Sequence, residues 1–251
     1  MEAQYLYTEK KRQQFREADA DGLIGMKGYM DYFQDAAASY MYHFGWGNDM
    51  VHERYGVAWV YVKYRMQVHE RTAYEAPLDL ECWIEPAGHS VSVKHALEIR
   101  KEGRLLANGR LESCLVDLEK RRITRLDAIE FDPVITIPRE NPTPDFSRIE
   151  QDTEGGEYIY SHRVRYSDLD NNGHMNNLRY IPLLLDCYSP EHHERKKLRD
   201  LEIHYRNQCL YDEEVRLFRI AEEENTDRLV ILKEDGTAAA CARFIWTEEM
   251  R

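Results

Sequence analysis

Apolar residues recur every three or four positions along one segment in the first half of the chain. This spacing places them on a single face of an α-helix, so it predicts a buried amphipathic helix over residues 26–44. Gly45 supplies the expected stop. The predicted face carries Met26, Tyr29, Met30, Phe33, Ala37, Tyr40, Met41 and Phe44.

Alternating apolar and polar residues follow this helix and predict β-strands. A second alternation begins at Val91, and residues 105–117 predict a further strand. The sequence Lys101-Glu-Gly-Arg104 is typical of a hairpin turn. The first of these strands is expected to present Val60, Val62, Tyr64, Met66 and Val68 on one face.

The second half of the chain repeats this plan. Residues 158–166 alternate, and residues 175–188 predict a second helix. Pro182 is expected to kink or shorten that helix, because proline removes one backbone hydrogen bond. The sequence Glu234-Asp-Gly236 predicts a turn between the last two strands. Strands are predicted near residues 201–206, 215–221, 228–233 and 238–246.

A proline-rich segment separates the two halves. It contains Pro133, Pro138, Pro142 and Pro144 and ends in Glu154-Gly-Gly-Glu157. We therefore expect an N-terminal unit over residues 1–130, a linker over 131–156 and a C-terminal unit over 157–251.

A short match also links the two halves, and it indicates a duplicated unit. One helix followed by antiparallel strands, twice over, predicts an α+β fold in which each sheet wraps a central helix. The match pairs Arg16, Asp19, Asp21 and Met26 with Arg165, Asp168, Asp170 and Met175 at the same spacing.

Composition narrows the class of protein. The formal net charge of −12 argues against general nucleic-acid binding, which needs a basic surface. No apolar run reaches the length of a membrane span, and the first residues lack a signal-peptide pattern, so we expect a cytoplasmic protein that binds no membrane. The five cysteines are odd in number and lack CxxC spacing, which argues against a disulfide framework and a structural zinc site.

The segment from Ser167 to Tyr180 concentrates acids, amides and one imidazole just before the second predicted helix. Its opening, Asp168-x-Asp170-x-Asn172-Gly173, matches the start of a calcium loop, but the twelfth position holds Arg179 instead of an acid. A purely structural alternative is that these residues cap a helix. That alternative does not explain His174.

A catalytic alternative does account for His174. Helix N–H groups polarise a bound carbonyl, Asp170 can act as base or nucleophile, and His174 can donate or orient hydrogen bonds. Asn172 offers both a donor and an acceptor. Such a set suits the transfer of an acyl group to water.

The same segment resembles the signature of the acyl-acyl-carrier-protein thioesterases of bacteria and plants. The family's D-x-N-x-H falls on Asp170, Asn172 and His174, and its Asn-Asn-x-x-Tyr-Ile falls on residues 176–181. A family strand of the form Glu-Tyr-Arg-x-Glu-Cys is similar to residues 203–209. Residues 33–37, 58–60 and 116–122 resemble first-half elements of the family, so the similarity covers nearly the whole chain.

The resemblance implies a double hotdog fold, in which the N-terminal unit holds the acyl chain and the C-terminal unit is catalytic. It implies hydrolysis of the fatty-acyl thioester of acyl carrier protein, with release of free fatty acid and without a metal or organic cofactor. The chain departs from the family at Gln208, where an acid is common, and an amide cannot be a general base. Cys209 is a second candidate nucleophile, ranked below Asp170.

Further residues are expected to bind substrate. Asn176 and Asn177 are expected at the helix entrance, either in substrate binding or as structural caps. Lys120-Arg-Arg122 and Arg195-Lys-Lys197 are candidate docking patches for the acidic carrier, with solvated turns as the alternative. The acyl tunnel is expected to be lined by Met30, Phe33, Ala37, Met41 and Trp59.

Other functions remain open from the sequence. They are an acyl-coenzyme A thioesterase, a noncatalytic acyl-binding protein and a hotdog dehydratase. A homodimer is also open.

Overall fold

The computed structural model describes residues 5–75, 77–86, 91–131 and 135–248. The chain divides into two compact units, Met1–Asp145 and Phe146–Arg251, which we call unit 1 and unit 2. The border therefore falls inside the segment predicted as a linker. Pro133 lies outside the described residues.

Unit 1 contains an antiparallel sheet in the order β1-β5-β6-β7-β3. These strands are β1 (Tyr7–Arg12), β5 (Pro77–Ile84), β6 (Ser92–Lys101), β7 (Arg104–Asp117) and β3 (Val57–Val68), and β8 (Arg122–Thr124) pairs with β7. A separate small sheet joins β2 (Leu23–Ile24) to β4 (Thr72–Ala73). The predicted turn at residues 101–104 is confirmed, with Glu102 and Gly103 at positive φ between β6 and β7.

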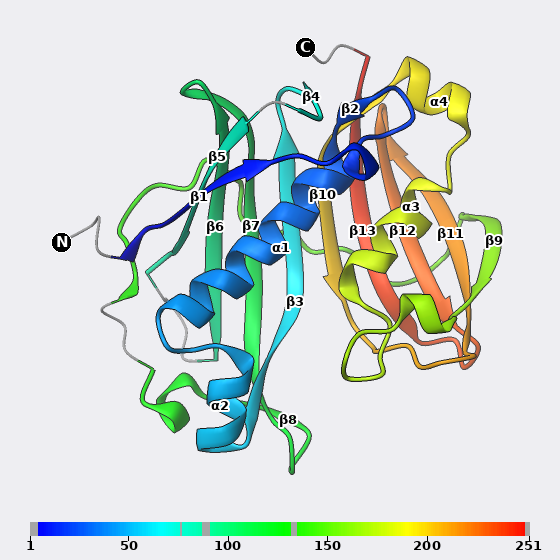
Figure 1. The fold of residues 1–251 in the computed structure, drawn as a ribbon. Coiled ribbons are helices and arrows are strands. Elements are labelled where there is room, and N and C mark those ends of the chain that lie inside the picture. The colour runs from blue at the N-terminus through cyan, green and yellow to red at the C-terminus, as the bar shows by residue number, and fades with distance from the viewer. Residues whose placement is uncertain (1–4, 76, 87–90, 132–134, 249–251) are drawn as a thin grey trace. The chain divides into compact units, whose positions relative to one another are not determined.

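The helix α1 (Met26–His43) crosses one face of this sheet, and a shorter helix, α2 (Asn48–Tyr55), follows it (Figure 1). The predicted apolar stripe of α1 is confirmed, since every member from Met26 to Met41 is buried. The hydroxyl of Tyr64 on β3 donates to the Met30 carbonyl at 2.8 Å. Phe33 packs edge-on against the Tyr64 ring, with centroids 5.0 Å apart. The apolar face of α1 is thus buried in the core of unit 1.

One prediction for β3 is wrong. The strand does not keep a single face, because its pairing with β7 shifts between Tyr61 and Lys63. Such a bulge inserts one extra residue and exchanges the two faces. Tyr64, Met66 and Val68 are buried as expected, but Trp59 replaces Val60 in the core, and Val60 is exposed.

Unit 2 contains antiparallel strands in the order β10-β13-β12-β11-β9. All of the predicted strands are present, and Gly236 at positive φ makes the predicted turn between β12 and β13. The strands are β9 (Glu157–Arg163), β10 (Lys197–Tyr205), β11 (Glu214–Glu223), β12 (Thr226–Lys233) and β13 (Ala238–Thr247).

The second predicted helix is wrong in its bounds. No helix begins at Met175: a 3-10 turn (Asn177–Arg179) leads into α3 (Tyr180–Leu185), and α4 (Pro190–Arg195) follows (Figure 1). Pro182 occupies the first turn of α3, where a missing N–H leaves no helical hydrogen bond unmade. A helix from residue 175 would need that N–H as a donor, which explains the later start.

The connecting segment is bound to each unit by polar contacts. In unit 1, Arg139 pairs with Glu81 and Glu98 and stacks 4.3 Å from the Trp83 ring. In unit 2, Ser147 donates to Glu202 through its N–H and its hydroxyl. We call residues 135–152 the strap, because both of its ends are fastened to a sheet.

None of the helices within the described residues is both long and apolar enough to cross a membrane.

Candidate active site

The polar segment folds into a tight turn that surrounds one carboxylate. Asp170 Oδ1 accepts hydrogen bonds from the backbone N–H groups of Asn172 (2.8 Å) and His174 (3.2 Å). The Asp170 N–H donates to the His174 carbonyl at 2.8 Å, and Gly173 adopts φ 77°. Positive φ is costly for other residues, so glycine suits this corner. Across the described part of the chain, no protein group hydrogen bonds to Asp170 Oδ2.

Asp168 fastens the turn to the unit. Its Oδ2 accepts from the Arg165 N–H and contacts His162 Nε2, both at 2.8 Å, and its carbonyl accepts from the Asn176 N–H. Burial alone would raise the pKa of Asp168, but these hydrogen bonds outweigh it and bring that pKa below its usual value. Asp168 Oδ2 is therefore committed to local structure.

The segment after β10 lies directly beside this turn. His174 and Leu210 form an isolated antiparallel β-bridge, and the Met175 N–H donates to the Cys209 carbonyl at 2.8 Å. Gln208 is exposed, and its carbonyl accepts from Lys233 Nζ at 3.0 Å. The fold thus brings Asp170, Asn172 and His174 next to the backbone of residues 208–210.

Cys209 is fully buried beside Tyr180. Burial raises the pKa of the thiol, and a hydrogen bond with Tyr180 only partly opposes that rise. A thiolate is therefore disfavoured, and the thiolate is the nucleophilic form of cysteine.

The two asparagines after the turn are engaged in local structure. Asn176 caps the 3-10 turn by accepting from the Leu178 N–H at 2.9 Å. The Asn177 carbonyl accepts from the Tyr205 hydroxyl at 3.1 Å. Since the helix α3 starts only at Tyr180, the expected helix mouth at Met175 is wrong. The backbone donors at Asp170 belong to a turn instead.

The residues expected to line an acyl tunnel all lie in unit 1. Met30, Phe33 and Ala37 are fully buried on α1, and Met41 and Trp59 are nearly so. The Trp59 indole N–H donates to the Trp46 carbonyl at 2.9 Å. The four α1 side chains form a continuous apolar stripe along that helix.

Unit 1 contains a second copy of the turn. Asp19 N–H donates to the Leu23 carbonyl, as Asp170 N–H does to His174, and the Gly22 N–H returns to the Asp19 carbonyl, as Gly173 does to Asp170. Gly22 also has positive φ, at 80°. Asp19 therefore corresponds to Asp170, and the predicted match of Asp19 with Asp168 is out by two positions. The shared Asp-x-x-Gly spacing was the sequence signal for this register.

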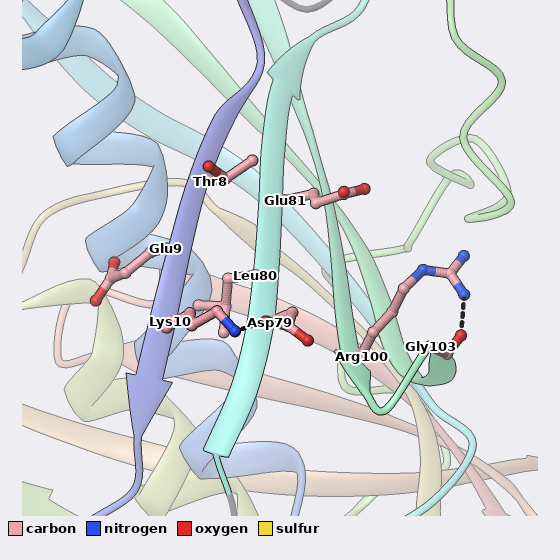
Figure 2. Close-up of a pocket in the computed structure, with 8 residues that line it drawn as sticks. All are labelled: Thr8, Glu9, Lys10, Asp79, Leu80, Glu81, Arg100 and Gly103. Atoms are coloured by element: carbon pink, nitrogen blue, oxygen red, sulfur yellow. Dashed lines mark hydrogen bonds and ion pairs between the residues drawn. The ribbon is translucent and has the colours of Figure 1, made fainter.

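A pocket at the β1–β5 edge of unit 1 contains none of the predicted site residues (Figure 2). Lys10 pairs there with Asp79, and Arg100 donates to the Gly103 carbonyl. These charged groups have partners within unit 1, and we assign the pocket no role.

Known proteins share both halves of this architecture. The acyl-ACP thioesterase N-terminal domain model matches residues 4–130, and the C-terminal domain model matches residues 151–248. The chain belongs to the acyl-ACP thioesterase family. The C-terminal match contains the whole Asp170 turn, and the N-terminal match contains its copy at Asp19.

Individual members of the family are distant in sequence. An oleoyl-acyl carrier protein thioesterase of Arabidopsis thaliana is 21% identical over 94% of this chain and 68% of its own length. A dodecanoyl-acyl-carrier-protein hydrolase of Cinnamomum camphora is 22% identical over 78% of this chain, which spans 54% of its length. An acyl-ACP thioesterase structure from Bacteroides thetaiotaomicron is 19% identical, with a TM-score of 0.89 over 98% of this chain and all of the other. That likeness shows the double hotdog fold.

Proposed function

We propose that this family member hydrolyses the fatty-acyl thioester of acyl carrier protein and releases a free fatty acid. The observation that carries the proposal is the Asp170 carboxylate. Two backbone N–H groups fix its Oδ1, while no described protein group hydrogen bonds to its Oδ2. A carboxylate fixed on one oxygen and open on the other is suited to act as a general base.

The reaction follows from this arrangement. Asp170 Oδ2 accepts a proton from water as the water oxygen attacks the thioester carbonyl carbon. The tetrahedral intermediate then collapses, the C–S bond breaks, and the leaving thiolate takes up the proton that Asp170 received from water, so that a carboxylic acid and the carrier's thiol are released and Asp170 is again a carboxylate. Asn172 and His174 stand next to Asp170 in the turn and supply hydrogen bonds to the water and to the developing oxyanion.

Substitutions in the turn test this proposal. Asp170→Asn and His174→Ala should each lower kcat on acyl-carrier thioesters, by about a hundredfold or more for Asp170→Asn, because a general base contributes at least that factor. Asp212→Asn is a matched control, since it removes a nearby exposed carboxylate outside the turn. Near wild-type kcat in folded Asp170→Asn and His174→Ala proteins would overturn the assignment.

Two neighbours of the turn need separate variants. Cys209→Ala should keep most of the activity, because the buried thiol is a poor nucleophile; a loss as large as that of Asp170→Asn would make Cys209 the catalytic group. Gln208→Glu should raise kcat if an added acid assists the water. Equal rates for the wild-type and Gln208→Glu proteins would show that Asp170 suffices.

The carrier half of the substrate needs its own test, and comparison of acyl-carrier and acyl-coenzyme A thioesters decides it. Both plant relatives named above act, by their names, on carrier-bound acyl groups, which favours the carrier. Those relatives are described as chloroplastic, so a cytoplasmic location for this chain stays a proposal. So does a homodimer, which sedimentation can test.

A further inference from the structure

In unit 1 the copy of the catalytic turn is filled by an arginine. Arg71 Nη2 lies 2.8 Å from Asp19 Oδ2 and 2.8 Å from Asp21 Oδ1, and Nη1 binds the second oxygen of Asp21. Nη2 also reaches the Leu23 carbonyl at 3.4 Å. The Arg71 side chain is only 10% exposed. One guanidinium thus occupies the centre of the turn.

The backbone of unit 1 is adapted to this cation. A Cβ on Gly25 would lie 2.6 Å from Asp19 Oδ2 and 2.8 Å from Arg71 Nε, so a side chain there would displace one partner of this ion pair. Burial raises the pKa of Asp19, and the charge of Arg71 opposes that rise. In unit 2 the residue that corresponds to Gly25 is Asn176.

Arg71 and Gln208 occupy equivalent positions. In unit 1, Ile24 pairs with Thr72, and in unit 2 the Met175 N–H donates to the Cys209 carbonyl, so Arg71 and Gln208 each precede the paired residue. The chain also leaves the preceding strand in the same way. The N–H groups of His69 and Glu70 share the Leu106 carbonyl, and those of Arg206 and Asn207 share the Ala239 carbonyl.

We propose that the side chain at this shared position determines whether each copy of the turn is open to substrate. Arg71 closes the unit 1 copy with its own guanidinium. Gln208 carries no charge and leaves Asp170 Oδ2 available to water. Unit 1 also has Leu23 where unit 2 has His174 and Asp21 where it has Asn172, so the ion pair replaces the whole chemistry of the turn. The inference rests on the proposed role of Asp170.

Transplanting the arginine tests the proposal in unit 2. Gln208→Arg should lower kcat/KM by on the order of a hundredfold, because the guanidinium would engage the carboxylate that serves as general base. The melting temperature should stay the same or rise. Gln208→Met controls for side-chain length without charge and should lose much less activity than Gln208→Arg. Equal losses for the two variants, or an active Gln208→Arg protein, would overturn the inference.

Failure of this inference is distinguishable from failure of the proposed function. If Asp170→Asn is inactive while Gln208→Arg is active, position 208 does not control access, and the catalytic role of Asp170 stands. If Asp170→Asn is active, the proposed catalytic role of Asp170 is wrong, and the inference about position 208 that rests on it is wrong as well.

Unit 1 gives a readout that does not depend on activity. Arg71→Ala should lower the melting temperature, because Asp19 and Asp21 lose their counter-charge. Guanidinium chloride, kept below its denaturing range, should restore part of that loss, whereas equal sodium chloride or urea should not. The double variant Arg71→Ala/Asp19→Asn should show no rescue. A wild-type melting temperature for Arg71→Ala, or equal effects of the three solutes, would contradict a closed guanidinium site.

Discussion

A single buried histidine gives unit 1 a pH dependence that is separate from catalysis. His95 on β6 is fully buried and packs edge-on against Tyr40, with ring centroids 5.8 Å apart. Burial lowers the pKa of His95 to about 4. The ring is therefore neutral in the folded protein at pH values where an exposed histidine is already protonated.

This depressed pKa predicts a loss of stability in mild acid. His95 takes up a proton near pH 6.5 in the unfolded chain and only near pH 4 in the folded chain. Protonation therefore stabilises the unfolded state relative to the folded state as pH falls through that window. The free energy of unfolding should fall by about 2 kcal/mol between pH 7 and pH 5. Urea unfolding of wild type and His95→Leu at both pH values checks this. The difference between the two proteins isolates His95, and identical pH dependence in both would contradict the prediction.

At the residue scale, the grouping of Asp170, Asn172 and His174 was predictable from sequence, whereas the arginine that binds the copy of their turn in unit 1 was not. Asp170, Asn172 and His174 lie within five consecutive residues, so local spacing places them together. Arg71 lies 50 positions from Asp21, and only the pairing of β2 with β4 brings them into contact. A pattern confined to neighbouring residues contains no information about that pairing.

At the scale of elements, the contact between α1 and β7 depends on a glycine. A Cβ on Gly109 would lie 2.8 Å from two ring carbons of Phe33 and 3.1 Å from the Arg65 carbonyl oxygen. The helix approaches the sheet this closely only because Gly109 has no side chain.

Gly109→Ala should therefore destabilise unit 1 by about 1–3 kcal/mol, the usual cost of overpacking a core. Phe33→Leu should recover part of that loss in the double variant, although it is destabilising alone. Denaturant titrations of the four proteins form a double-mutant cycle. Strict additivity would show that the Phe33 contact is not the cause. If α1 binds the acyl chain, the chain-length profile of Gly109→Ala should shift as well.

Elements with strong periodicity were predicted well, and those shaped by one irregular residue were not. The stripe of α1 spans several turns, so its bounds agree to within a residue. The bulge in β3 depends on its register with β7, which its own alternation cannot show. The helix expected at Met175 begins at Tyr180, because the preceding residues satisfy their polar groups within turns.

At the scale of the whole molecule, the net charge of −12 opposes an acidic carrier. The proposed binding of the carrier would then depend on local cations, and the two predicted patches differ in how many exposed cations they offer. Lys196 and Lys197 contact Asn225 and the His193 carbonyl, and Lys120 pairs with Asp117. Arg121 and Arg122 are exposed at the turn between β7 and β8, which makes them the stronger candidates.

Charge reversal of Arg121 and Arg122 to Glu should raise KM for acyl-carrier substrates roughly threefold to tenfold at low salt. The effect should shrink at high ionic strength, where surface charges are screened. A simple acyl-pantetheine thioester, which lacks the carrier's acidic surface, provides the control and should show unchanged kinetics. An equal change in KM for both substrates would indicate that the arginines do not contact the carrier.

The strap divides its contacts at the border of the units. Residues up to Asp145 bind unit 1: Asn141 contacts Glu85, and Asp145 pairs with Lys94. Residues from Ser147 onward bind unit 2, where Arg228 donates to the Asp152 carbonyl at 2.6 Å. Cleavage of the peptide bond between residues 145 and 146 would therefore leave each fragment with its own hydrogen bonds and ion pairs to the strap. This position therefore suits gene fission or a split reporter, since each half would keep its own contacts with the strap.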